Sequence, residues 1–277
     1  MIPHRIADDN ISGSSEIARQ IVDWLKDLPL SETDAALSGL LPSLESLEEK
    51  FKHFAVVRHL IRALKQHLHS IDSNADTKQR SLSEFLKEYR QTWDFNQRLA
   101  AERIIKEINF NNKVVLLHSH SRSLVVLFEL LAQKGIHTEI IQTVSEPGKE
   151  GIVQARRLSP KGFTVKLINE AATSRFIGDV DMLICGADAV YPDFIINKTG
   201  TMMLALLCRH FKKNFYVLTD SRKFSDFEPD VSLFPGEFWE AAKPPAEILE
   251  NPPPNIIPVN YYFEPVPRNL ADSIFTE

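Results

Sequence analysis

The feature that most constrains the fold is a series of short aliphatic runs that alternate with helical stretches between residues 113 and 224. The runs occupy residues 113–119, 137–144, 163–170, 181–188 and 214–220. Several of them are almost continuously apolar, as expected of strands in a parallel sheet that helices cover on both faces. The pattern predicts an α/β fold with about five strand–helix units, a Rossmann-like doubly wound parallel sheet.

The first hundred residues have a different pattern. Their apolar residues recur at spacings of three and four, as in residues 17–25 and 57–64, which is typical of amphipathic helices. Ser81 and Glu84 have the spacing of a capping box, so we expect a long helix to begin there. The sequence thus predicts an all-helical N-terminal domain.

The change of pattern sets the expected domain limits. We assign residues 1–108 to the helical N-terminal domain and residues 109–277 to the Rossmann-like domain. The second domain ends in a Pro-rich tail, and we expect residues 270–277 to form a short terminal helix.

The charge balance argues against a nucleic-acid partner. The chain has 32 Lys and Arg against 37 Asp and Glu, a net charge of -5, whereas phosphate binding needs a basic face. Neither an apolar N-terminal leader nor a run long enough to span a membrane is found. We therefore expect a cytoplasmic protein with no membrane or direct nucleic-acid partner.

We expect no cofactor and no metal. Cys185 and Cys208 lie in apolar runs and are interpreted as small buried residues. The chain has no CxxC motif or Cys/His cluster of the kind that binds zinc. It also has neither of the Gly-rich motifs, GxGxxG and GxxxxGK[ST], that bind nucleotide phosphates.

Polar residues follow the first predicted strand. In a parallel sheet, ligands bind outside the carboxyl ends of the strands, near the point where the strand order reverses. His118, Ser119, His120 and Ser121 lie there, before a helix whose N-terminal N–H groups suit a phosphate or carboxylate. These residues are candidate ligand contacts, although any single serine can equally be a helix N-cap.

Two later segments supply charged candidates. Asp188 follows a Gly-Ala pair at a strand tip, where a carboxylate can transfer a proton; a turn or capping aspartate is the alternative. Asn197 and Lys198 precede a helix, and a lysine there opposes the helix dipole unless an anion offsets it. We expect Lys198 to bind a phosphate or to pair with Asp188, with a solvated lysine as the alternative.

Taken together, these motifs resemble a known family. HSHS after a strand, ICGADAV, IINKTGT and DSRKF are similar to motifs of a family with two branches. One branch holds the alpha, beta and delta subunits of translation initiation factor 2B. The other holds the isomerases of methylthioribose 1-phosphate and ribose 1,5-bisphosphate. SGSSEIARQIVDWL and FEPVPRNLADSIFTE extend the resemblance to nearly the whole chain.

The resemblance implies a fold, an assembly and site residues. It implies homodimers or larger oligomers formed through the Rossmann-like domain. In the isomerases, a cysteine after the first strand works with the aspartate of the GAD motif, while the NK pair holds the substrate. Asp188, Asn197 and Lys198 match these positions, and the cysteine position falls on Ser119. Asp188 and Ser119 are thus the candidate catalytic residues, with His118 or His120 as the base.

Other positions depart from the isomerase pattern. The isomerases carry arginines where this chain has Ser12, before Gly13, and Glu146. Because charge-assisted hydrogen bonds are the strong contacts to phosphate, the missing cations predict weak binding of a bisphosphate. Ser12, Gly13 and Glu146 remain candidate ligand-binding positions by the resemblance.

The sequence leaves several functions open. The leading interpretation is an initiation-factor-2B-like protein without standard isomerase activity, with a small phosphorylated sugar or nucleotide as ligand and initiation-factor-type protein partners. The alternative is an aldose–ketose isomerase with Asp188 as acid/base. A third is an architectural subunit with an empty pocket.

Overall fold

The computed structural model of the chain describes residues 2–7, 9, 12–28, 34–52, 54–70, 75–225 and 243–277. It divides into two compact units, Met1–Asn96 and Gln97–Glu277, which we describe separately. The division falls inside a long helix rather than at its end. The last turns of this helix pack into the core of the second unit through Ala100, Ala101 and Ile104. Helical periodicity in the sequence does not show which core a helix packs into.

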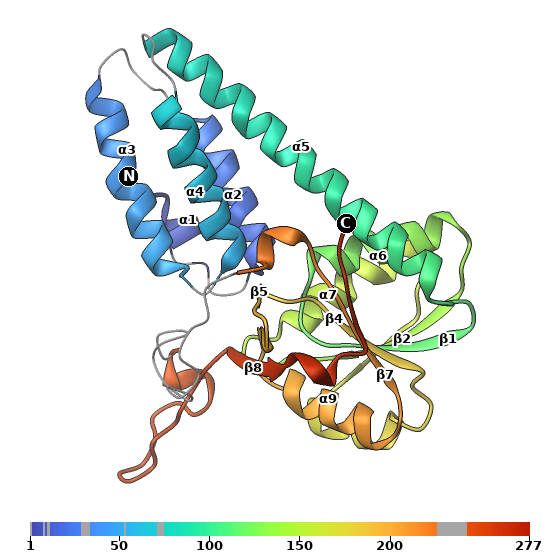
Figure 1. The fold of residues 1–277 in the computed structure, drawn as a ribbon. Coiled ribbons are helices and arrows are strands. Elements are labelled where there is room, and N and C mark those ends of the chain that lie inside the picture. Colours follow the sequence, from blue (N-terminus) through green and yellow to red (C-terminus); the bar gives the residue numbers. More distant parts are fainter. Residues whose placement is uncertain are drawn as a thin grey trace. The chain divides into compact units, whose positions relative to one another are not determined.

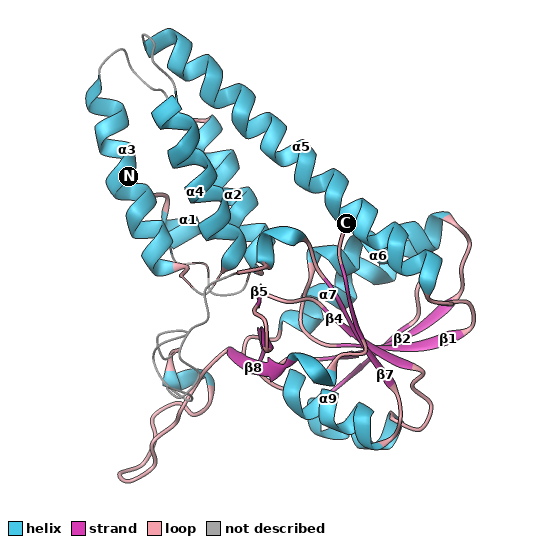
Figure 2. Ribbon diagram, viewed as in Figure 1, coloured by secondary structure: helices cyan, strands magenta, loops and turns pink. Residues whose placement is uncertain are grey.

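The secondary structure described in the first unit is all helical, as predicted. Its helices are α1 (His4–Ala7), α2 (Ser14–Lys26), α3 (Asp34–Lys50), α4 (Ala55–Ser70) and the first part of α5 (Ala75–Glu107), drawn in cyan in Figure 2. The apolar stripes recognised in the sequence are buried, with Ile21, Leu25, Leu60 and Leu64 fully inaccessible. No helix in the described ranges is long and apolar enough to cross a membrane.

The predicted helix start at Ser81 is wrong. Helix α5 already begins at Ala75, so Ser81 lies within the helix and cannot cap it. Its hydroxyl lies 3.1 Å from Nε2 of His67 on α4. A Ser and a Glu at capping-box spacing also occur on helical surfaces, and the spacing alone does not distinguish the two cases.

The second unit is built on a parallel sheet with the strand order β3-β2-β1-β4-β7-β9 (Figure 1). Its strands are β1 (Lys113–Leu117), β2 (Thr138–Thr143), β3 (Val165–Ile168), β4 (Met182–Cys185), β7 (Asn214–Leu218) and β9 (Ser273–Phe275). The main helices that connect them are α6 (Arg122–Gln133), α7 (Glu150–Leu158), α8 (Thr173–Phe176) and α9 (Thr201–His210). The predicted doubly wound α/β fold is confirmed.

The apolar runs are continuous because both faces of the sheet are buried. On β1, Val115 and Leu117 pack into one core with residues of α6, whereas Leu116 packs into another core with residues of α9. The same alternation places Ile184 of β4 in the first core and Leu183 in the second. Alternate side chains on one strand therefore serve two cores.

The predicted terminal helix over residues 270–277 is wrong. Residues Ser273–Phe275 form β9, which pairs in parallel with β7 at the edge of the sheet. So short a strand carries too little pattern to be recognised, and its pairing is a tertiary effect. A second small antiparallel sheet, which the sequence did not predict, consists of β5 (Ala189–Val190), β6 (Phe194–Lys198) and β8 (Phe263–Pro267).

Candidate ligand-binding site

The strand order of the large sheet reverses between β1 and β4. Strands β2 and β3 lie on one side of β1, and the later strands β4 and β7 lie on the other. Leu117 of β1 pairs with Ile184 of β4, so the chain leaves both strands at the same edge (Figure 1). His118 and Ser119 follow β1, and Asp188 follows β4, at the position where doubly wound sheets bind ligands.

His118 is completely buried and held at both ring nitrogens. Its Nδ1 lies 2.7 Å from Oγ1 of Thr143 on β2, and its Nε2 lies 2.9 Å from the carbonyl oxygen of Thr199. Because a carbonyl oxygen only accepts, Nε2 carries the hydrogen. Burial lowers the pKa of His118 to about 4, so at neutral pH the ring is uncharged and Nδ1 accepts from the Thr143 hydroxyl.

Ser119 lies in a backbone conformation that few non-glycine residues adopt. Its φ is 65°, and Ser145, which contacts it, has a φ of 68°. The Ser119 N–H donates to Oγ of Ser145 at 2.7 Å, and its carbonyl accepts from Nε2 of Gln142 at 3.2 Å. Residues held in the left-handed region are uncommon and concentrate at functional sites. The ends of β1 and β2 thus fix the backbone of Ser119.

The next residues are anchored to α7. Nδ1 of His120 lies 2.5 Å from Oε1 of Gln154, which also accepts from the Ser121 N–H at 3.2 Å. A Cβ at Gly186 would lie 2.6 Å from Oγ of Ser121, so the absence of a side chain after β4 allows this close approach. His118 and His120, the two candidate bases, are both engaged with protein atoms.

Lys198 forms a buried ion pair with Glu150, the first residue of α7. Nζ of Lys198 lies 2.9 Å from Oε1 of Glu150, and the two side chains are 2% and 10% exposed. The ammonium also lies 4.3 Å from the ring centroid of Tyr262, a cation–π contact. Burial raises the pKa of Glu150; the Lys198 charge opposes this shift and the Asp188 charge adds to it. Glu150 is not among the residues that the sequence predicts for this site.

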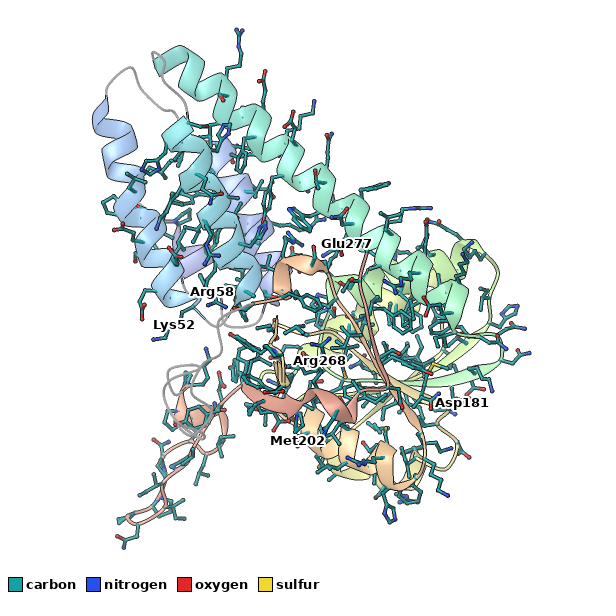
Figure 3. The ribbon with its side chains drawn as sticks, viewed as in Figure 1. Lys52, Arg58, Asp181, Met202, Arg268 and Glu277 are labelled. Carbon is teal, nitrogen blue, oxygen red and sulfur yellow. The ribbon has the colours of Figure 1, made fainter. Side chains whose placement is uncertain are left out.

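Asn197 and the start of α9 are occupied by protein groups. Nδ2 of Asn197 donates to Oγ1 of Thr201 at 2.9 Å. Oε1 of Glu264 accepts from the N–H groups of Gly200 and Met202, each at 2.8 Å; Met202 is labelled on α9 in Figure 3. A carboxylate from β8 therefore takes the anion position at this helix N-terminus.

A second cation lies near Asp188. Nζ of Lys223 donates a short hydrogen bond to the carbonyl oxygen of Ala187. Burial lowers the pKa of Lys223, and the negative charges of Asp188 and Asp220 oppose this shift. Asp220 accepts from Nε and Nη2 of Arg222 at 2.8 and 2.9 Å. These residues belong to the segment DSRKF, one of the motifs that carry the family resemblance, for which the sequence alone predicts no role.

Three further candidates remain. Ser12 and Gly13 belong to the first unit, where the Ser12 N–H donates to Oδ1 of Asp9 at 2.8 Å and Gly13 precedes α2. Glu146 is exposed in the loop before α7, with Oε1 3.8 Å from Nζ of Lys149. Within the described parts of the chain, no group of three His, Cys, Asp or Glu residues is placed to hold a metal ion.

Comparison with known proteins shows similarity to both branches of one family. The model of the Initiation factor 2 subunit family matches residues 10–277. A stretch of 116 residues, 42% of this chain, is 36% identical to translation initiation factor eIF2B subunit alpha of Dictyostelium discoideum. That stretch covers 36% of the Dictyostelium protein. The whole chain also aligns with ribose 1,5-bisphosphate isomerase of Pyrococcus furiosus at 26% identity, and the alignment covers 88% of that protein.

The fold also recurs in a solved assembly. A chain of the tetrameric eIF2B-beta2-delta2 complex from C. thermophilum superposes with a TM-score of 0.74, covering 99% of this chain and 88% of that one. The two sequences are 14% identical, so the likeness concerns the fold alone.

Proposed function

We propose that this chain, which belongs to the initiation factor 2 subunit family, is an initiation-factor-2B-subunit-like protein without standard isomerase activity. It forms a homodimer or larger oligomer through its α/β unit. It binds a small phosphorylated sugar or nucleotide at the edge of the sheet where Ser119 and Asp188 lie, and its protein partners are of the initiation-factor type.

The state of His118 is the observation that carries this proposal. The resemblance places Ser119 where the isomerases have a cysteine, and a serine hydroxyl needs an adjacent base to act as a nucleophile or acid. Nε2 of His118 donates to Thr199, and Nδ1 accepts from Thr143. A ring bonded in this way has no free lone pair to take a proton from Ser119. This removes His118 as the base for Ser119 and supports the absence of standard isomerase chemistry.

The charges at the site support the same conclusion. Glu146 is an exposed carboxylate where the resemblance places an arginine, and Lys198 is already paired with Glu150. A bisphosphate carries up to four negative charges and depends on several unpaired cations. The site is therefore poorly suited to the substrate of the bisphosphate isomerases.

Assembly through the α/β unit is supported by the surface of α9 and the turn after it. Met203, Leu206 and Phe211 are 46%, 51% and 45% exposed, although each is large and apolar. Adjacent exposed apolar side chains often mark an interface. Sedimentation velocity is expected to give an oligomer that Leu206→Asp dissociates and the exposed control Lys134→Glu leaves intact; a monomeric wild type would contradict the assembly.

An isomerase assay tests the absence of catalysis. Wild type and Asp188→Asn are incubated with methylthioribose 1-phosphate and with ribose 1,5-bisphosphate, and ketose formation is followed by NMR. We expect no enzymatic conversion by either protein. Rapid ketose formation by the wild type that is lost in Asp188→Asn would overturn the proposal.

The second candidate function is an aldose–ketose isomerase that uses Asp188 as acid/base. The similarity to ribose 1,5-bisphosphate isomerase along the whole chain favours it, as does the presence of Asp188, Asn197 and Lys198. The same assay decides between the two functions, because only this one requires turnover that depends on Asp188.

A further inference from the structure

The place beside Lys198 is filled by a carboxylate of the chain itself. Glu150 Oε1 lies 2.9 Å from Nζ, and both side chains are at least nine-tenths buried. The loop before α7 packs closely on this carboxylate, since a Cβ at Gly148 would lie 2.6 Å from Oε1. The pair is thus built into the end of the sheet and is not a passing surface contact.

A second positive position at this edge is filled in the same way. Glu264 accepts two N–H bonds at the start of α9, where the helix dipole would otherwise attract an anion. Lys223, the further buried cation near Asp188, is bonded to the Ala187 carbonyl and faces the charges of Asp188 and Asp220. Protein groups therefore already engage Lys198, Lys223 and the N-terminus of α9.

We infer that Glu150 is a specificity-determining residue that excludes phosphate groups from Lys198 and restricts that position to hydroxyl groups of the ligand. A phosphate near Glu150 meets a like charge, and a phosphate monoester, which is mostly dianionic at neutral pH, has little hydrogen to donate to the carboxylate. A sugar hydroxyl, in contrast, can donate to a carboxylate. The buried Oε2 of Glu150 has no hydrogen-bond partner among the described residues, so the carboxylate has unused acceptor capacity.

This inference deepens the proposed function and rests on it in one respect, that a small ligand binds at this edge. It sets the ligand's orientation: the hydroxyl-bearing part faces Lys198 and Glu150, and any phosphate lies away from them. A ligand with phosphates at both ends cannot satisfy this arrangement, whereas a ligand with one phosphate can.

The test replaces one carboxylate by its neutral isostere. Glu150→Gln keeps the side-chain shape but leaves Lys198 with an uncompensated charge that phosphate can pair with. Glu129→Gln is the matched control, because it removes an equal charge from an ion pair of similar length, 2.8 Å, with Lys161 on another part of the same unit. Full-length wild type and both variants are titrated with inorganic phosphate at constant ionic strength, with chloride as the reference anion.

The expected result is a gain of function in one variant only. Phosphate should bind Glu150→Gln roughly tenfold more tightly than the wild type, the effect of one added charge-assisted contact. It should also raise the melting temperature of this variant more than that of wild type or Glu129→Gln. Equal phosphate affinities and equal shifts in all three proteins would overturn the inference.

Failure of the variant to fold is also informative. If Glu150→Gln does not fold in chloride because Lys198 is left unpaired, phosphate should restore its folding by supplying the missing charge, and no restoration would count against the inference. The outcome is independent of the isomerase assay. Turnover of a sugar phosphate speaks against the proposed function, whereas the phosphate response of Glu150→Gln speaks only to the role of this side chain.

Discussion

Protonation of His118 should destabilise the α/β unit at mildly acidic pH. In the unfolded chain the imidazole has its ordinary pKa of 6.5, whereas burial lowers the folded value to about 4. Between these values the unfolded state holds a proton that the folded state lacks, so stability falls as the pH falls. At about 1.4 kcal/mol per pH unit, the free energy of unfolding falls by about 3 kcal/mol between pH 6.5 and pH 4 because of this one residue.

Substitution by a non-titrating residue isolates the effect. His118→Gln can still donate to Thr199 and accept from Thr143, but it binds no proton in this range. Native-state hydrogen exchange of the slowest amides in β1 and β4 gives the free energy of unfolding of this unit at pH 7 and pH 5. The wild type should lose about 2 kcal/mol more than His118→Gln over this interval.

The exposed His137 provides the control. His137→Gln should keep the wild-type pH dependence, because it leaves His118 in place. Identical losses in the wild type and in His118→Gln would refute the argument that burial holds the ring of His118 neutral.

Close packing, burial and a helix cap each give one further prediction. A Cβ at Gly151 would lie 1.8 Å from a backbone carbonyl oxygen of β2, so Gly151→Ala should lower the melting temperature sharply, whereas Gly178→Ala, with nothing within 4 Å, should not. Burial raises the pKa of the Cys185 thiol far above its usual range and that of Cys208 to about 12, so a thiol reagent at pH 8 should label both only after denaturation. Glu264→Gln should cost about 1 kcal/mol in chemical denaturation by weakening the charge at the α9 N-terminus; an unchanged stability would show that the cap contributes little.

The sequence predicted the parts of the fold that depend on repeated local pattern. The apolar runs of β1, β4 and β7 are strong signals because both faces of each strand are buried. The same signals placed His118, Ser119 and Asp188 at strand ends and so, by the geometry of parallel sheets, at one edge. Strand β9 carries no such repeat, and its place beside β7 is set by pairing between residues distant in the chain.

The partners of the site residues could not be predicted in this way. Glu150 is 48 residues from Lys198 in sequence, and nothing in its local context distinguishes it from an ordinary acidic residue at a helix start. Glu264 and Gly200 are likewise far apart in the chain. A sequence pattern identifies which residues lie at strand ends, but it does not show which charges neutralise one another there, and at this site those pairings determine the chemistry.

The central claim is that the sheet edge binds a small sugar phosphate without converting it. Crystals of the wild type grown with ribose 5-phosphate test it most directly, because the density reports both occupancy and the chemical form of the sugar. The account predicts an unconverted aldose within hydrogen-bonding distance of Ser119 or Asp188, with its phosphate away from Lys198. A ketose at this position, or a phosphate bound to Lys198 in place of Glu150, would contradict it.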